Sequence, residues 1–283
     1  MFVLPLAERL IRRRLNAIGI ESGYHPTRQG RLHYYEVRGE GAGPPLVILH
    51  GFGASASSYG RVLAMLRRRA SRIWAPEAPA HGFSSSAAAR LTVDDAYAAV
   101  SDFLHSRLTE PTVLFGNSLG GAFAIRYALE HPERVRGLLL ASPAGALLDA
   151  QDFAALTASF RVRSLGQARS LLDRLYHEPP WYNPLLAPDI LRRFAVGPLR
   201  HCLESFRPEH MFTPDELAAL RPPPLMLWGQ SERLLPSTSL EFFRRVLPAH
   251  VRIEEPSEFG HCPYLDRPRA VADKIADFLA ELR

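Results

Sequence analysis

The sequence of 283 residues predicts an α/β fold, in which a mostly parallel central sheet is flanked by helices and carries an inserted helical cap. Two observations predict this class. Short apolar runs alternate with helical segments in residues 31–142 and again in 223–283, which is typical of a parallel sheet covered on both faces. Between these segments, residues 143–222 show no convincing strand. We therefore expect one core domain in two segments, with residues 143–222 folded over it as a cap.

The strands of the core are predicted from short apolar runs bounded by turn residues. They are expected at 32–37, 46–50, from 72 onward, and at 112–115, 135–142, 225–228 and 251–255. The run LVILH at 46–50 is continuously apolar, which indicates a strand buried on both faces.

Helices are expected between these strands and after the last of them. Thr92 and Asp95 have the spacing of a capping box, which predicts a helix from Thr92 to about Leu108. Further helices are expected over 119–131 and, as a closing amphipathic helix, over 268–283.

The expected cap is rich in helical stretches and is broken by the Pro-rich segment EPPWYNP at 178–184. Three prolines at 222–224 mark the return to the sheet. Binding sites for small molecules are mostly apolar clefts with a few polar groups. We expect the cap to supply such a lining from WYNPLL (181–186) and from Phe153, Leu156 and Phe160.

Residues 1–30 are expected to form an N-terminal amphipathic extension. Apolar residues at helical spacing are interleaved with Arg9 and with the arginines at 12–14. These charges follow the first apolar residues, whereas a signal peptide carries its charges in front of them. We expect a helix on the domain surface. The alternative is a peripheral contact with an anionic membrane surface or with a partner protein.

Composition argues against several functional classes. The net charge is +5, but no arginine-rich block is interleaved with aromatic residues, so nucleic-acid binding is not expected. No run of 18 apolar residues is present. Cys202 and Cys262 lie outside any CxxC or Cys/His cluster, which argues against a structural zinc site and against a disulfide framework. We expect a cytoplasmic protein that uses neither a metal nor an organic cofactor.

The segment TVLFGNSLGG at 112–121 contains the pattern G-x-S-x-G between a predicted buried strand and a predicted helix. In this context the glycines permit a sharp strand-to-helix turn that exposes the Ser118 hydroxyl at the edge of the sheet. Ser118 is therefore the candidate nucleophile. The alternative is a tight glycine-rich turn in which the serine only caps the helix.

A serine hydroxyl needs a base that takes its proton, and the base needs a carboxylate that orients it. His261 lies far downstream of Ser118, in a loop before the last helix, and is the candidate base. Glu232 follows the predicted strand at 225–228 and is the preferred acid, while Asp149, after the preceding strand, is the main rival. A surface loop histidine and a solvated glutamate are the alternatives.

Acyl transfer also needs backbone donors for the oxygen that becomes negative. The segment HGFGAS at 50–55 directly follows a predicted strand and offers amides flanked by glycine. We expect the N–H groups of Phe52 and of Leu119, the residue after the nucleophile, to form this oxyanion hole. Otherwise Gly51 and Gly53 only mark a turn.

Together these motifs resemble the α/β-hydrolase superfamily, in its esterase/lipase and meta-cleavage hydrolase branch, over residues 31–283. The segments that carry the resemblance are HGFG (50–53), PEAPAHGFS (76–84), GNSLGG (116–121), WGQSERLLP (228–236) and GHCPYLDRP (260–268). The resemblance implies Ser118 as nucleophile, His261 as base, and an acid after the strand that ends near Trp228.

This sequence departs from the family pattern at three positions. Glu232 stands where the family usually has Asp, and its side chain is one methylene longer. Glu77 and Ala80 stand where the family usually has Asp and Gly, and we expect both of these changes to be structural.

The first functional hypothesis is a serine hydrolase that cleaves small-molecule carboxylic esters through an acyl-enzyme. Carbon–carbon bond hydrolysis uses the same residues, but its substrates carry a carboxylate, so an arginine is required in the pocket. Arg126, Arg192 and Arg193 are the candidates. Acyl transfer and thioester cleavage are further alternatives. A binding protein without activity is disfavoured by the intact serine, histidine and carboxylate.

Overall fold

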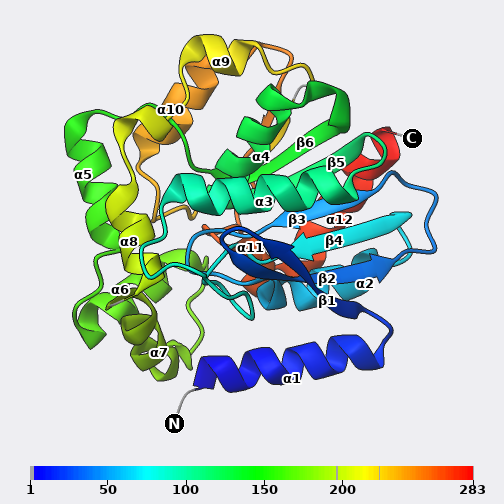
Figure 1. Ribbon diagram of the computed structural model, residues 1–283. Coiled ribbons are helices and arrows are strands. Elements are labelled where there is room, and N and C mark those ends of the chain that lie inside the picture. The colour runs from blue at the N-terminus through cyan, green and yellow to red at the C-terminus, as the bar shows by residue number, and fades with distance from the viewer. Residues whose placement is uncertain (1–2, 196, 223, 283) are drawn as a thin grey trace.

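The computed structural model describes residues 3–195, 197–222 and 224–282, so residues 1, 2, 196, 223 and 283 of the expected segments lie outside it. The described strands form one eight-stranded sheet in the order β1-β2-β4-β3-β5-β6-β7-β8 (Figure 1). Their bounds are β1 Glu21–Thr27, β2 Gly30–Arg38, β3 Leu46–Leu49, β4 Arg72–Pro76, β5 Thr112–Ser118, β6 Val135–Pro143, β7 Pro224–Leu227 and β8 Arg252–Glu254. The pairs β1/β2 and β2/β4 are antiparallel and the others are parallel, which confirms the predicted fold class.

Two layers of helices cover the two faces of this sheet. Leu46 and Ile48 of β3 face one cluster of buried side chains, while Val47 and Leu49 face the other. The first face is covered by α2 (Gly60–Leu66) and α12 (Pro268–Glu281), the second by α3 (Val93–Arg107), α4 (Leu119–Glu130) and α10 (Ser237–Val246). Burial on both faces explains why β3 is apolar at every position from Leu46 to Leu49.

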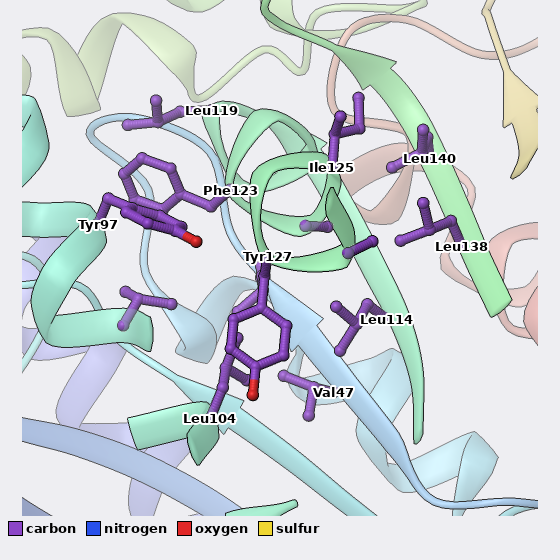
Figure 2. Close-up of a cluster of buried hydrophobic side chains, with 14 of the residues drawn as sticks. Val47, Tyr97, Leu104, Leu114, Leu119, Phe123, Ile125, Tyr127, Leu138 and Leu140 are labelled. Atoms are coloured by element: carbon purple, nitrogen blue, oxygen red, sulfur yellow. The ribbon is translucent and has the colours of Figure 1, made fainter. Parts of the chain in front are cut away.

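Figure 2 shows the second cluster, in which α4 packs onto the sheet. In this view Phe123 of the helix lies beside Tyr97 of α3, and Ile125 lies beside Leu140 of β6. Leu114 of β5 belongs to the same cluster of buried side chains. Each fully buried side chain of this size contributes about 1.5–3 kcal/mol to the hydrophobic stabilisation of the fold. The core therefore holds α4 against β5 and β6, and thereby holds the turn that joins β5 to α4.

The predicted capping box of α3 is confirmed. The Asp95 N–H donates to Thr92 Oγ1 over 3.0 Å, and the Thr92 N–H donates to Asp95 Oδ2 over 3.0 Å. Two backbone donors at the start of the helix are thus satisfied reciprocally.

The residues between β6 and β7 form helices, and no strand is found among those that the structure describes there. The helices are α5 (Ala150–Ser159), α6 (Leu165–Leu175), α7 (Asn183–Ala195), α8 (Pro198–Ser205) and α9 (Pro214–Ala218). Leu171 and Leu172 of α6 pack on Ile190 and Phe194 of α7, and this small core also takes in Leu234. Figure 1 shows α5 to α8 gathered at one side of the sheet.

The N-terminal segment differs from its prediction in one respect. The predicted helix is present as α1 (Val3–Ala17), but β1 belongs to the sheet, which therefore begins ten residues before the expected position 31. The sequence ESGYHPT of β1 lacks an apolar alternation because its strand lies at the sheet edge and is held by its ladder with β2.

One face of α1 packs on the protein and the other is exposed. Leu15 is buried, whereas Leu6, Arg9, Leu10 and Arg13 face outward. The membrane or partner contact expected from the sequence concerns this outer face and stays a prediction. Among the described residues, no helix is at once long and apolar enough to cross a membrane.

Candidate active site

Ser118 occupies a strained turn between β5 and α4. Its backbone angles are φ +53° and ψ −121°, a region that costs a residue other than glycine about 1–3 kcal/mol. Gly120 permits this turn, since a Cβ atom there would lie 2.2 Å from the carbonyl oxygen of Leu49. The sharp turn predicted from the sequence is therefore present, and Ser118 is 6% exposed.

His261 and Glu232 form a buried pair. His261 lies between β8 and α11 (Pro263–Asp266), and its Nδ1 is 2.8 Å from Glu232 Oε2. The other carboxylate oxygen accepts the N–H groups of Leu234, at 2.8 Å, and of Leu235, at 3.0 Å. Both side chains of the pair are 3% exposed. The longer glutamate thus reaches the imidazole while the loop that carries it satisfies its second oxygen.

The environment of Glu232 favours its ionised form. Burial alone would raise the pKa of this carboxyl, but His261, the N–H of Leu235 and the hydroxyl of Ser142 together outweigh it. The net pKa is therefore below the ordinary value. An ionised acceptor keeps a proton on Nδ1 of His261, which leaves Nε2 free to act as a base.

Asp149, the rival acid, has a different role in the structure. It is exposed and forms the N-cap of α5, where its Oδ1 accepts the N–H of Asp152 over 2.8 Å. Capping residues of this kind stabilise a helix by about 1 kcal/mol. The geometry thus brings Glu232, and not Asp149, to His261.

Asn117 holds the loop of His261 beside Ser118, and the sequence pattern did not single it out. Its Nδ2 donates to the carbonyl oxygens of His261, at 2.8 Å, and of Ala141, at 2.9 Å. The side chain is fully buried, so both bonds lie out of water. One residue next to Ser118 in the chain therefore fixes the distance between β5 and the loop of His261.

The predicted oxyanion loop also lies against Ser118. A Cβ atom on Gly51 would lie 3.1 Å from the Cβ of Ser118, so this glycine allows the loop to approach closely. In the described part of the chain, the N–H of Phe52 has no hydrogen-bond acceptor. Leu119 is the first residue of α4, where a helix has unpaired N–H groups. The expected donor at Phe52 thus lies in the loop after β3, and the one at Leu119 lies at the start of α4 directly after Ser118.

Two neutral histidines support this loop. His81 Nε2 accepts the N–H of Gly53 over 3.0 Å, and His50 Nε2 accepts the N–H of Ala78 over 3.0 Å. The Nδ1 atoms lie 2.9 Å from backbone carbonyl oxygens, so each ring carries its single proton on Nδ1. Burial lowers the pKa of both imidazoles below the ordinary value of 6.5.

These histidines predict that stability falls in mild acid. Unfolding exposes both rings, so below pH 6.5 the unfolded chain binds protons that the folded protein excludes. Their stabilising contribution is complete above pH 6.5 and is lost as the pH falls towards the lowered values, by at most about 2.7 kcal/mol per pH unit for two protons. Urea unfolding between pH 7.5 and 5.5 measures this loss. The variant His81→Gln is expected to show a shallower dependence, and an equal slope in both proteins would contradict the assignment.

Ser118 and His261 line one small cavity of about 140 Å³. Its walls are mainly apolar and come from the cap, from Leu234 and from α1, with Phe160, Leu171, Leu172, Leu186, Ile190, Phe194 and Leu4 among them. Cys262 also borders the cavity, but burial raises the pKa of its thiol to about 12. Its sulfur is therefore protonated at neutral pH and does not compete with Ser118 as a nucleophile.

The cap residues expected in the lining divide into three groups. Phe160 and Leu186 line the cavity at Ser118. Phe153 and Leu156 line instead a neighbouring cavity of about 550 Å³, which Leu119 also borders. Trp181, expected in the lining, is 85% exposed and does not line the cavity at Ser118.

The three arginine candidates also lie apart. Arg193 of α7 lines the cavity at Ser118. Arg126 lines the neighbouring cavity and is paired with Asp94, at 3.0 Å, and with Glu130, at 3.1 Å. Arg192 borders a surface groove beside α1. No group of three or more His, Cys, Asp or Glu side chains in the described ranges is arranged to hold a metal ion.

The two further departures from the family pattern have structural roles. Glu77 is fully buried, and its carboxylate accepts the N–H of Ala56 over 3.1 Å and that of Phe83 over 2.6 Å. Ala80 has φ +64°, a conformation that favours glycine. The expectation that both changes are structural agrees with these contacts.

A strained serine at the end of a parallel strand, a buried His–carboxylate pair and an apolar cavity between core and cap define the architecture of an α/β-hydrolase. Residues 46–274 match the model of the Alpha/beta hydrolase family, so the chain belongs to this family.

This chain is similar over most of its length to several named proteins. A pimeloyl-[acyl-carrier protein] methyl ester esterase of Xylella fastidiosa (strain 9a5c) is 26% identical over 88% of this chain and 99% of its own. A 2-hydroxymuconate semialdehyde hydrolase of Pseudomonas sp. (strain CF600) is 29% identical over 85% of this chain and 88% of its own. Among solved structures, a membrane phospholipase A, a bacterial virulence factor, has a TM-score of 0.83 and 26% identity, and the match covers 99% of this chain and 91% of that one.

Proposed function

We propose that the protein is a serine hydrolase that cleaves uncharged carboxylic esters, with Ser118 as nucleophile, His261 as base and Glu232 as the orienting acid. The observation that carries this proposal is the buried pair of His261 and Glu232 at 2.8 Å, whose histidine lines the same cavity as Ser118. The family and its esterase relatives support the same reaction class.

In the proposed reaction, Nε2 of His261 takes the proton of Ser118 Oγ as this oxygen attacks the ester carbonyl carbon. The carbonyl oxygen becomes negative and accepts hydrogen bonds from the N–H groups of Phe52 and Leu119. Collapse of this intermediate breaks the bond to the alcohol, which receives the proton from His261. Water then gives a proton to His261 and attacks the acyl carbon. The bond between this carbon and Ser118 Oγ breaks, His261 returns the proton to Oγ, and the carboxylic acid is released.

The strained turn at Ser118 and the preformed loop at Phe52 support this mechanism energetically. Donors that are already in position need no rearrangement when charge develops on the substrate. The loop is fixed by His50 and His81 before a substrate arrives, since both accept backbone N–H groups in the free protein.

Carbon–carbon bond hydrolysis is the second candidate, because a relative of that activity is 29% identical and because Arg193 lines the cavity. We rank it below ester hydrolysis, since this arginine already has a carboxylate partner in Glu8. Acyl transfer and thioester cleavage would use the same residues.

The apolar cavity predicts a preference for acyl chains longer than acetyl. Each methylene group buried in it adds about 0.8 kcal/mol, which is about four-fold in kcat/KM until the cavity is full. Medium-chain and aryl esters of 4-nitrophenol are therefore expected to react faster than the acetate. Measuring kcat/KM for a graded series of 4-nitrophenyl esters tests this.

A matched pair of variants places the preference in the cavity. Leu186→Phe narrows the wall of the cavity and is expected to move the optimum to shorter acyl chains. Leu185→Phe is the control, because Leu185, the residue before Leu186 in the chain, is exposed. A clear preference of the wild-type protein for acetyl esters would contradict the prediction.

A further inference from the structure

The N-terminal helix α1 forms part of the wall of the catalytic cavity. The N–H groups of Val3 and Leu4 both donate to Asp189 Oδ2 of α7 over 2.8 Å, which fastens the start of α1 to the cap (Figure 1). Leu4 and Glu8, one helical turn apart, line the same cavity as Ser118 and His261. The extension expected to lie on the surface therefore contributes directly to the site.

Glu8 is the sole acidic residue of α1, and it points inward. Its side chain is 8% exposed, and its Oε1 lies 3.2 Å from Arg193 Nη2 and accepts the hydroxyl of Ser55 over 2.9 Å. Arg193 in turn donates through Nη1 to the carbonyl oxygen of Gly53 over 2.8 Å. The pair thus joins α1, the cap helix α7 and the loop that carries Phe52.

This pair sets the charge of the cavity. Apart from His261, the residues that line the cavity in the described part of the chain include two with charged side chains, and these are Glu8 and Arg193. Each cancels the charge of the other. An unpaired arginine here would attract an acyl group that ends in a carboxylate, because charges interact strongly in a site shielded from water.

We propose that Glu8 is a specificity-determining residue, which neutralises Arg193 and so restricts the catalytic cavity to substrates with uncharged acyl groups. This proposal rests on the proposed ester hydrolysis and adds the substrate class. Because Arg193 is bound to Glu8 and to Gly53, a substrate carboxylate gains no free cation, and burying it without a partner is costly. Selection against a wrong substrate by an uncompensated charge is an established route to specificity.

The test compares the wild-type protein with Glu8→Gln on three 4-nitrophenyl esters that share one leaving group. The acyl groups are hexanoate, adipate with its free carboxylate, and 6-trimethylammoniohexanoate. The amide oxygen of the variant can still accept the hydroxyl of Ser55, while Arg193 loses its counter-charge. The ratio of kcat/KM for adipate to that for hexanoate is expected to rise at least about 10-fold, equivalent to about 1.4 kcal/mol.

Glu241→Gln on α10 is the matched control, since it changes the net charge equally at an exposed position away from the cavity. The reciprocal variant Arg193→Met leaves Glu8 unpaired, and it is expected to raise the ratio for the trimethylammonio ester by at least about 10-fold. The measurement on Arg193→Met tests the specificity role of the Glu8–Arg193 pair even if Glu8→Gln does not fold.

Ratios in the folded variants that stay within about two-fold of the control would overturn the specificity role and leave Glu8 as a structural residue. Labelling with a fluorophosphonate probe separates this result from failure of the proposed function. Variants that are labelled but unchanged in selectivity contradict only the role of Glu8. A wild-type protein that is neither labelled nor active on any of the three esters contradicts the hydrolase itself.

Discussion

Replacing Ser118 with alanine is expected to abolish ester hydrolysis, with a loss of turnover on the order of 10⁴–10⁶-fold. The variant removes the hydroxyl that forms the acyl-enzyme in the proposed mechanism, while His261 and Glu232 are expected to keep their hydrogen bond. The turnover of a 4-nitrophenyl ester measures the loss, and thermal unfolding shows that the fold is intact.

Covalent labelling makes this prediction specific to one residue. A fluorophosphonate probe is expected to modify the wild-type protein once, at Ser118, and to leave Ser118→Ala unmodified. Ser106→Ala is a suitable control, because Ser106 is exposed and lies away from the cavity. If labelling survives in Ser118→Ala, another residue is the nucleophile and the proposed mechanism is wrong.

Replacing Glu232 with glutamine is expected to lower turnover by about 10²–10⁴-fold. The equivalent amide substitution in serine proteases costs about 10⁴-fold, because the amide favours the wrong tautomer of the histidine. In this protein the amide would face Nδ1 of His261 in place of the oxygen that now lies 2.8 Å away. Glu232→Asp is expected to retain more activity than Glu232→Gln, since the charge survives and only the reach shortens.

Asp149→Asn is the decisive comparison for the acid. Because Asp149 caps α5 and is exposed, its replacement by asparagine is expected to leave turnover nearly unchanged under the same assay conditions. Circular dichroism of both variants checks their folding. If Asp149→Asn loses most of its turnover and Glu232→Gln keeps nearly normal turnover, the acid lies after β6 and not after β7.

Local sequence patterns determined most of the core fold. Strands buried on both faces are rich in apolar residues, so runs such as 46–49 and 113–115 could be recognised without knowledge of their neighbours. The capping box at Thr92 is likewise local, because it acts within one turn of the chain, and the glycines around Ser118 form a short motif that is recognisable in the sequence. The order of the candidate serine, acid and histidine followed from their positions after successive strands.

The tertiary structure decided the features that depend on residues far apart in the sequence. Strand β1 has no apolar alternation, since it is stabilised by backbone hydrogen bonds to β2. Backbone hydrogen bonds do not require particular side chains, so the sequence does not reveal them. Asn117 and His261 are 144 residues apart, and their hydrogen bond appears once β5 and the loop after β8 are placed side by side.

Glu8 shows most clearly that the role of a residue can depend on a partner far away in the sequence. In the sequence it is one acid among the arginines of an amphipathic helix, as a solvated residue would be. Glu8 is the sole acidic residue of α1, which could have drawn attention to it, but its role depends on Arg193, 185 residues away. A charge is buried only when a partner of opposite sign lies beside it, and packing of α1 against the cap supplies that partner. The sequence by itself thus determined which residues form the candidate reaction centre, whereas the charge of the cavity beside them was decided by the packing of α1, α7 and the loop at Gly53.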